Sequence, residues 1–180
     1  MTRIFDIFFS FVGIIFLLPI LTFLFIVCYI DSRSPIYKQT RVGREMVPFT
    51  IFKFRTMYKN TNSVPTHLIN PNSITRAGKI IRKLKLDELP QLFNVLNGDM
   101  SLVGPRPCLF VQEELIQERL SRGVFHVRPG ITGLSQINGI DMSTPSQLAM
   151  EDEKMIINCN IMNYFKYILI TLIGKRKKLD

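Results

Sequence analysis

The longest apolar run of the chain lies at its N-terminus, between Ile4 and Ile30. Its few interruptions are Asp6, Ser10, Gly13, Pro19 and Thr22. A helix crosses the apolar core of a bilayer with about 20 residues, so this run is long enough to enter or to cross a membrane. It is too long for a cleavable signal peptide, and no small-residue cleavage pattern follows it. The hydropathy pattern therefore predicts a membrane helix over residues 1–31.

Two arrangements of this helix fit the pattern. Pro19 removes a backbone donor near the middle of the run, which favours a kink and a re-entrant helix that returns on the side it entered. A straight helix would instead span the bilayer. Arg3 alone precedes the run, whereas several basic residues follow it, namely Arg33, Lys38, Arg41 and Arg44. Because Lys and Arg gather on the cytoplasmic side, residues 32–180 are expected in the cytoplasm. The pattern leaves the spanning and re-entrant forms open.

Short segments of alternating residues, typical of strands, follow the membrane helix. Ile36 to Thr40 and Phe49 to Met57 predict a β-hairpin, because the connection RVGREMVP contains a glycine and a proline. Alternation along the second strand places Lys53 and Arg55 on one face. Two cations on one face can hold a diphosphate, and they are equally typical of a solvated strand face.

Helical patterns dominate the rest of the chain. Residues 59–75 are rich in Asn and Pro and predict a surface loop that could act as a lid. A basic helix is predicted from Thr75 to Lys85, and a polar helix from Leu109 to Arg122. Thr144 and Pro145 predict a further helix start, with a capping residue followed by proline. The expected fold class is therefore α+β, mostly helical, with one small hairpin.

Near the C-terminus, apolar residues recur at helical spacing and a basic tail follows them. The apolar positions are Ile157, Ile161, Phe165, Ile168 and Leu172, and the basic ones are Lys175, Arg176, Lys177 and Lys178. Such a stripe fits a core helix. It fits equally an amphipathic helix at the membrane interface, with the tail drawn to anionic lipid.

The net charge and the cysteine spacing indicate which classes of ligand and which compartment to expect. The net charge is +9, from 23 Lys and Arg against 14 Asp and Glu. The basic residues lie beside apolar segments and no nucleic-acid motif is present, so anionic lipid or phosphorylated substrates are expected, and no nucleic acid. Cys28, Cys108 and Cys159 show no metal-ligand or disulfide spacing, which is typical of reduced thiols in a cytosolic compartment.

An acidic pair, Asp87-Glu88, stands just before Pro90 and among several cations. Pro90 fits a helix only in its first turn, so a helix is predicted from about Asp87 to Leu96, with Asn97-Gly98 as its stop. A helix N-terminus presents free N–H groups that suit a phosphate. For an isolated pair, a helix cap and a first-turn acid would be sufficient roles.

Two Gly/Pro loops indicate that Asp87 and Glu88 have a role beyond capping a helix. Arg106 stands between Pro105 and Pro107 in GPRP, where the prolines restrict the backbone that carries it. Arg128 lies in a second such loop, VRPGITG. The planar guanidinium group suits phosphate oxygens. Together with the acidic pair, the two loops predict a phosphate site.

The chain resembles the bacterial sugar transferase family, in particular its small monotopic phosphoglycosyl transferases, from Arg3 to about Gly174. The segments that carry the resemblance are SPIYKQTRVG, FTIFKFRTM, AGKIIRKLKLDELPQLFNVLNGDMSLVGPRP and VRPGITGLSQING. The resemblance implies transfer of a sugar 1-phosphate from a UDP-sugar to undecaprenyl (polyprenyl) phosphate, with release of UMP. The product, a polyprenyl-diphosphate sugar, would begin the synthesis of O-antigen, capsule, exopolysaccharide or a glycoprotein glycan.

The resemblance also implies roles for individual residues. Asp87 would attack the β-phosphorus and form a covalent phosphosugar, while Glu88 would help to hold Mg²⁺. Lys53, Arg82 and Arg106 would contact phosphate, and Arg128 the nucleotide or a phosphate. A diphosphate repels an incoming carboxylate, so a metal ion and cations are needed to neutralise it.

Placement follows from the same resemblance. It favours the re-entrant form of the first helix, with its break at Pro19. The molecule would then be one monotopic domain on the cytoplasmic face of the bacterial inner membrane, with several amphipathic interfacial helices and membrane lipids as partners. It would be the minimal catalytic unit, without the multi-span region of larger members. A homodimer is left open.

Two departures from the family pattern bear on these expectations. Leu18 stands where many members have a serine before the proline, which removes a hydroxyl that can bond the freed backbone. Ile140-Asp141 follows Asn138-Gly139 where many members have Arg-Asn, so the sugar is not inferred from other members. An N-acetylated amino sugar is the expectation.

Two other functions fit the same residues. A membrane-bound, Mg²⁺-dependent phosphohydrolase of polyprenyl diphosphates would use the same acids and cations but release inorganic phosphate. A membrane scaffold for glycan assembly would use Asp87 and Glu88 only as caps, and Asp87→Asn would leave its function intact.

Overall fold

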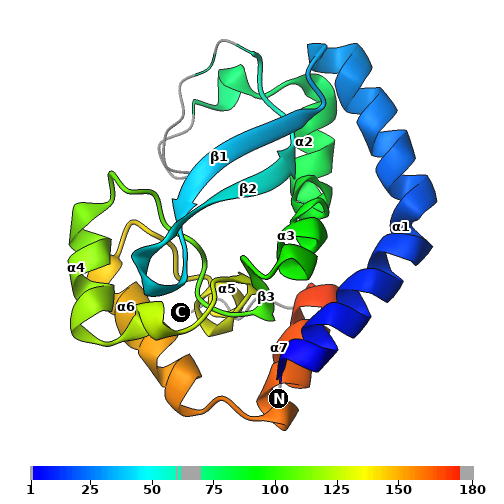
Figure 1. The fold of residues 1–180 in the computed structure, drawn as a ribbon. Coiled ribbons are helices and arrows are strands. Elements are labelled where there is room, and N and C mark those ends of the chain that lie inside the picture. Colours follow the sequence, from blue (N-terminus) through cyan, green and yellow to red (C-terminus); the bar gives the residue numbers. More distant parts are fainter. Residues whose placement is uncertain (1, 60, 62–69, 175–180) are drawn as a thin grey trace.

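The computed structural model describes residues 2–59, 61 and 70–174 of the 180-residue chain. This part is mostly helical with two small two-stranded sheets, so the predicted α+β class with a long apolar N-terminal helix is confirmed (Figure 1). That helix, α1 (Thr2–Ser32), runs along one side of the molecule. Most of the loop predicted at residues 59–75 lies outside the described residues, and its role as a lid stays a prediction.

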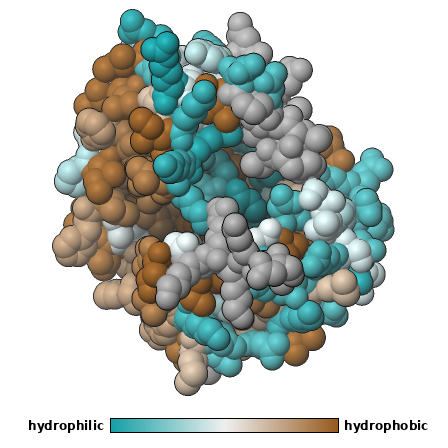
Figure 2. Space-filling view, turned by 180° about the vertical axis from the view of Figure 1, so that it is seen from behind, coloured by the Kyte–Doolittle hydropathy of each residue, from teal (hydrophilic) through white to brown (hydrophobic). Residues whose placement is uncertain are grey.

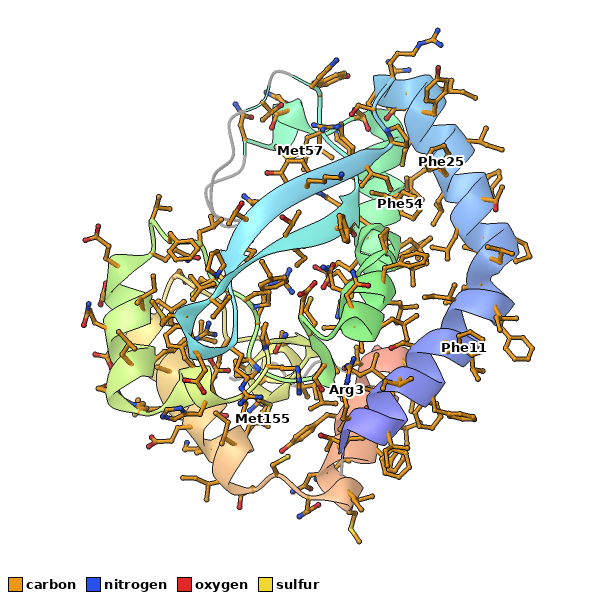
Figure 3. All side chains as sticks on the ribbon, viewed as in Figure 1. Arg3, Phe11, Phe25, Phe54, Met57 and Met155 are labelled. Carbon is orange, nitrogen blue, oxygen red and sulfur yellow. The ribbon has the colours of Figure 1, made fainter. Side chains whose placement is uncertain are left out.

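α1 contains the whole apolar run and continues through Pro19 without interruption. Figure 3 shows that the helix changes direction between Phe11 and Phe25, the stretch that holds Pro19. The proline provides no N–H for the helical ladder, and the Thr22 hydroxyl donates to the carbonyl oxygen of Leu18 at 2.9 Å. Both features favour bending. The Thr22 hydroxyl thus bonds a carbonyl of the helix within one turn of the proline.

Most of α1 faces outward. Its buried residues are Asp6, Ser10, Leu21, Leu24 and Cys28. Large apolar side chains cover the rest, and two of them, Phe16 and Ile4, are 78% and 75% exposed. Figure 2 shows hydrophobic surface gathered along the side that α1 forms. The helix is long and apolar enough to cross a membrane, which supports membrane association.

Polar residues dock the first turns of α1 onto the rest of the molecule. The guanidinium of Arg3 donates to the carbonyls of Val95 and Leu96 at 2.6 and 3.1 Å, at the C-terminal end of α3 (Gln91–Asn97) (Figure 3). Asp6 is 2% exposed, and its Oδ1 accepts three hydrogen bonds of 2.8–2.9 Å. The donors are the Ser101 hydroxyl, the Leu102 N–H and the Tyr164 hydroxyl.

The second half of α1 packs on the same body through apolar contacts. Leu21, Leu24 and Cys28 form one core cluster with Phe54 and Ile81. Both ends of α1 are therefore attached to the domain that follows it, the first by hydrogen bonds and the second by buried apolar side chains.

The predicted hairpin is confirmed. β1 (Ile36–Val42) and β2 (Pro48–Phe54) pair antiparallel and are joined through the short helical turn η1 (Arg44–Met46). The second strand ends earlier than predicted, because Met57 pairs with Ile74 rather than with β1.

A second sheet, which the sequence did not predict, pairs β3 (Ser101–Val103) with β4 (Gly130–Thr132) in parallel. The backbones of Gly104 and Gly130 come so close that a Cβ on Gly130 would lie 2.0 Å from the Gly104 nitrogen. Only glycine fits there. This contact brings the two Gly/Pro loops of the sequence side by side.

The helices after the hairpin largely follow the predicted pattern. α2 (Arg76–Lys83) begins at Thr75, whose hydroxyl accepts the N–H of Gly78 at 3.0 Å. The remaining helices are α4 (Glu113–Ser121), α5 (Leu134–Ile137), α6 (Pro145–Ile157) and α7 (Ile161–Ile173). α4 starts later than predicted, because the Gln112 side chain accepts the N–H of Leu109 in the turn before it.

The C-terminal stripe is not one helix. α6 ends at Ile157, and α7 starts afresh behind Asn160, whose side chain accepts the N–H of Asn163 at 2.8 Å. Ile157 and Leu172 are 75% and 79% exposed, so the core interpretation of the stripe is wrong for them. The buried residues of α7 are Tyr164 and Tyr167. The interfacial interpretation stays a prediction, and the basic tail lies outside the described residues.

Candidate active site

The acidic pair lies in a tight turn, η4 (Leu86–Glu88), between α2 and α3. The predicted helix from Asp87 to Leu96 is therefore wrong at its start, because α3 begins at Gln91. Lys85, at φ 56°, turns the chain out of α2, and Pro90 precedes the first residue of α3. Both acids thus extend from a turn rather than from a helix terminus.

Glu88 is held between two cations. Its Oε1 accepts from Lys53 Nζ at 2.9 Å and from Arg106 Nη2 at 2.6 Å. Lys53 comes from β2, and Arg106 from the loop that follows β3. Two positive charges thus face the Glu88 carboxylate, and the neighbouring Asp87 carboxylate also attracts both of them.

The surroundings set the charge states of this trio. Burial alone would raise the pKa of Glu88, but Arg106 and Lys53 outweigh it and hold this pKa below its ordinary value. Glu88 in turn raises the pKa of Arg106. Burial lowers the pKa of Lys53 despite the attraction of Glu88. The ion pairs themselves keep the carboxylate charged near neutral pH.

Asp87 differs from its neighbour. It is 9% exposed, and no cation of the described residues lies within ion-pair distance of its carboxylate. Burial first, and then Glu88, raise its pKa, while Lys53 and Arg82 act in the opposite direction. A buried carboxylate that no cation neutralises is a better nucleophile than one held in two ion pairs.

The other two predicted phosphate contacts, Arg82 and Arg128, bond to different parts of the molecule. Arg82 on α2 donates through Nε to the Thr56 hydroxyl at 2.7 Å, and its charge acts to lower the pKa of Asp87. Arg128 instead donates through Nε to the carbonyl of Gly98 at 2.8 Å, at the end of α3. Arg128 thus stabilises the C-terminus of a helix, and among the described residues it makes no hydrogen bond or ion pair with Asp87 or Glu88.

The loop that carries Arg106 is held through its carbonyl groups, as sequence reasoning did not foresee. The carbonyls of Pro105, Arg106 and Pro107 accept, in that order, from the N–H of Gly130 at 2.8 Å and from two guanidinium groups at 2.9 and 3.0 Å. These guanidinium groups belong to Arg119 on α4 and Arg41 on β1.

Arg119 belongs to a buried polar cluster. It is 1% exposed, and its Nε and Nη2 donate to Oδ2 of Asp152 at 3.1 and 2.6 Å. Asp152 is 0% exposed, and its Oδ1 accepts from the Ser135 hydroxyl at 3.0 Å. Arg119 lies within the polar helix predicted from Leu109 to Arg122, and no local signal distinguishes it. Its role depends on the packing of α4 against α6.

The donor set of the pair fits Mg²⁺ in one particular way. No group of three or more His, Cys, Asp or Glu side chains suited to a metal occurs in the described part of the chain. Mg²⁺ is usually held by one or two carboxylates together with substrate phosphates and water. Gln91, three residues after Glu88, has a buried Nε2 without a hydrogen-bond partner among these residues. Such a donor suits a phosphate oxygen, so the site fits a metal that arrives with a phosphorylated substrate.

Comparisons with known proteins agree with this chemistry. Residues 1–177 match the family described as bacterial sugar transferase. The uncharacterised sugar transferase EpsL of Bacillus subtilis is 47% identical over 121 residues, which cover 67% of this chain and 59% of the relative. The undecaprenyl-phosphate glucose phosphotransferase of Komagataeibacter xylinus is 42% identical over 149 residues, 76% of this chain and 27% of the relative.

A third relative is named for both of its substrates. The UDP-glucose:undecaprenyl-phosphate glucose-1-phosphate transferase of Klebsiella pneumoniae is 40% identical over 156 residues, 83% of this chain and 33% of the relative. The chain thus spans between 27% and 59% of the length of these three proteins. Because the family match extends over residues 1–177 and includes the acidic pair and both Gly/Pro loops, this chain belongs to the bacterial sugar transferase family.

Proposed function

We propose that the protein is a phosphoglycosyl transferase, which moves a sugar 1-phosphate from a UDP-sugar to polyprenyl phosphate and releases UMP. The observation that carries the proposal is the acidic pair, in which Glu88 is ion-paired to two cations and Asp87 is not. The names of the relatives, with UDP-glucose as donor and undecaprenyl phosphate as acceptor, support the reaction class. The product would start the assembly of a bacterial glycoconjugate.

The reaction proceeds in two displacements. The Asp87 carboxylate attacks the β-phosphorus of the UDP-sugar, and an O–P bond forms as the bond to the bridging oxygen breaks. UMP leaves with that oxygen and its electron pair. An oxygen of polyprenyl phosphate then attacks the same phosphorus, and Asp87 departs as a carboxylate. The product is a polyprenyl-diphosphate sugar.

The surrounding charges lower the repulsion between a carboxylate and a diphosphate. Lys53 and Arg106 already face the pair and can bind phosphate oxygens in exchange for Glu88. The charge of Arg82 also favours the carboxylate form of Asp87. Mg²⁺ bound with the donor would supply further neutralisation, with Glu88 as its protein ligand. Sequence reasoning gave the attack to Asp87 and the metal to Glu88, and this division of roles stays a prediction.

On the acid side, the rate should fall at a pH above 3.8, which is the ordinary pKa of an aspartate. Only the carboxylate form of Asp87 attacks, and burial followed by Glu88 raises its pKa. Because Lys53 opposes this shift, Lys53→Met should move the fall in rate to still higher pH. The measurement is kcat/KM for UMP release from acidic to neutral pH. Coincident pH–rate profiles for the two proteins would contradict this account of Asp87.

We infer that α1 is re-entrant, with its bend at Pro19, and that the domain lies on the cytoplasmic face of the inner membrane. The support is that both ends of α1 are attached to one domain, through Arg3 and Asp6 at the start and Leu24 and Cys28 near the end. A helix that crossed the bilayer would need its first turn to leave these partners and to place Asp6 on the far side.

Labelling of single cysteines in spheroplasts tests this arrangement. In a background with Cys159→Ser, Thr2→Cys should resist a membrane-impermeant maleimide until the cells are opened, as should the cytoplasmic reference Ser121→Cys. Labelling of Thr2→Cys in intact spheroplasts, with Ser121→Cys still protected, would mean that α1 spans the membrane.

The function itself is tested with purified protein, Mg²⁺ and a panel of UDP-sugars that includes glucose, galactose and N-acetylated amino sugars. Without acceptor, intact mass should show a sugar-phosphate adduct with one donor, and added polyprenyl phosphate should then release UMP continuously. UMP release only after acceptor addition, without any adduct, would indicate direct transfer. Inorganic phosphate from a polyprenyl diphosphate would indicate a phosphohydrolase, and no turnover with any donor would favour a scaffold.

A further inference from the structure

Four consecutive carbonyl groups, from Pro105 to Cys108, accept hydrogen bonds from three different parts of the fold, namely β4, α4 and β1. Gly130 on β4 bonds the first, Arg119 on α4 the second, and Arg41 on β1 the third, at 2.8–3.0 Å. The N–H of Val42 bonds the carbonyl of Cys108 at 3.0 Å. The prolines restrict φ, but ψ is fixed only when the direction of each carbonyl is fixed. The four hydrogen bonds therefore fix the remaining backbone angles of the loop.

The two arginine donors are themselves held in place. Arg119 is tied to Asp152 through two nitrogens and is 1% exposed. Arg41 is 8% exposed, and its Nε and Nη2 donate to Oε1 of Gln39 at 3.0 and 2.6 Å. In each residue, one nitrogen remains for the loop and the others are fixed by a neighbour. A donor that is itself held in place keeps the carbonyl that it bonds in place as well.

Stability alone is a poor explanation for this arrangement. A buried ion pair such as Arg119–Asp152 costs as much to desolvate as it gains, and well-packed apolar side chains usually serve a core equally well. Arg41 also lies near a like charge, and burial followed by Arg106 lowers its pKa to about 10. Burying the Arg41 cation near Arg106 is unfavourable for folding, so packing alone does not explain its place.

We propose that Arg119 and Arg41 are positioning residues that aim the Arg106 guanidinium at Glu88 and at the donor diphosphate by fixing the carbonyls of residues 106 and 107. The proposal rests on the proposed transferase function. Neither arginine touches the substrate. Each acts through the backbone of the loop, where Arg106 Nη2 reaches Glu88 at 2.6 Å. A shift of about 1 Å in such a group can cost about 100-fold in rate.

The test separates positioning from folding. Arg119→Met alone leaves Asp152 buried without its partner, so the double variant Arg119→Met/Asp152→Leu is used, in which both charges are replaced and the core stays apolar. We expect this variant to keep the thermal midpoint of the wild type within a few degrees. Its kcat/KM for the UDP-sugar should fall about 10- to 100-fold, mainly through kcat. Arg122→Met, at the C-cap of the same helix and with a partly exposed side chain, is the matched control and should change neither quantity.

A double-mutant cycle with Arg106→Met completes the test. If Arg119 acts through Arg106, its replacement in the Arg106→Met background should lower kcat/KM no further. Arg41→Met should behave in the same way. Effects that multiply with that of Arg106→Met, or an unchanged rate in the stable double variant, would overturn the proposal. Absence of turnover in the wild type with every donor would instead refute the transferase function. In that case the same double-mutant cycle would be measured on the affinity for UDP with Mg²⁺, by calorimetry.

Discussion

Asp87→Asn is expected to abolish sugar-phosphate transfer, with a loss of about 10⁴-fold or more in kcat, as is common when a nucleophile is removed. An amide oxygen does not attack a phosphorus at a useful rate, and Asp87 is the acid that no described cation neutralises. The fold should stay intact, because Asn has nearly the same shape and no ion pair of the described residues is lost. UMP release and the intact mass of the protein after incubation with donor measure the effect.

The matched control for this substitution is Asp31→Asn, an exposed carboxylate at the end of α1. It should retain the rate and the adduct of the wild type. Substantial UMP release by Asp87→Asn would exclude Asp87 as the nucleophile and would leave Glu88 or direct attack by the acceptor. Loss of turnover together with a lower thermal midpoint would point to a structural role for Asp87 instead.

Glu88→Gln should lower both stability and activity, in contrast to Asp87→Asn. The neutral amide leaves Lys53 and Arg106 close to each other without a counter-charge, and breaking such a pair typically costs about 3 kcal/mol. Activity should fall about 100-fold or more, since the two cations lose their fixed positions and the metal loses a ligand. The concentration of Mg²⁺ needed for half-maximal rate should rise. Thermal unfolding and UMP release over a range of Mg²⁺ concentrations measure these effects.

The stability difference between wild type and Glu88→Gln has a defined pH dependence. Because the pKa of Glu88 is depressed below its ordinary 4.5 in the folded protein, the carboxylate contributes fully above that pH. The contribution should then shrink as the pH falls below 4.5 towards the lower folded value. Glu151→Gln, which breaks the ion pair with the largely exposed Lys154, is the control and should lower stability by less than about 1 kcal/mol. Equal losses of stability in the two variants would contradict the view that the ion pairs of Glu88 stabilise the fold more than a surface pair does.

Much of the local structure could be predicted because its causes are local. The length of the apolar run predicted α1, alternation with a Gly/Pro turn predicted the hairpin, and Thr75 and Thr144 marked the starts of α2 and α6. The start of α3 was misplaced because Pro90 is compatible with two positions, the first turn of a helix and the residue just before it. The C-terminal stripe was misread because a helical period persists across the break between α6 and α7.

In the site, too, the residues with a local sequence signal were predicted and those that depend on packing were not. Sequence reasoning found Asp87, Glu88 and Arg106 from an acidic pair beside a Gly/Pro loop, and Lys53 from strand alternation and the family resemblance. The structure brings these four together. Sequence reasoning also proposed Arg128, a cation in a similar loop, whose Nε bonds the carbonyl of Gly98 at the end of α3, and its contact with a nucleotide or a phosphate stays a prediction. An arginine in such a loop has the same local signature whether it faces a substrate or a carbonyl.

The sequence by itself determined the membrane helix, the hairpin, most helices and the identity of the acidic pair. Hydropathy, alternation and capping depend on residues a few positions apart, and a single chain displays them directly. Only the tertiary structure decided that Asp6 in the apolar run is buried against Tyr164, which is 158 positions away, and that Arg119 holds the loop of Arg106. Such contacts depend on how helices and strands pack, and the residues that make them carry no local mark of their partners.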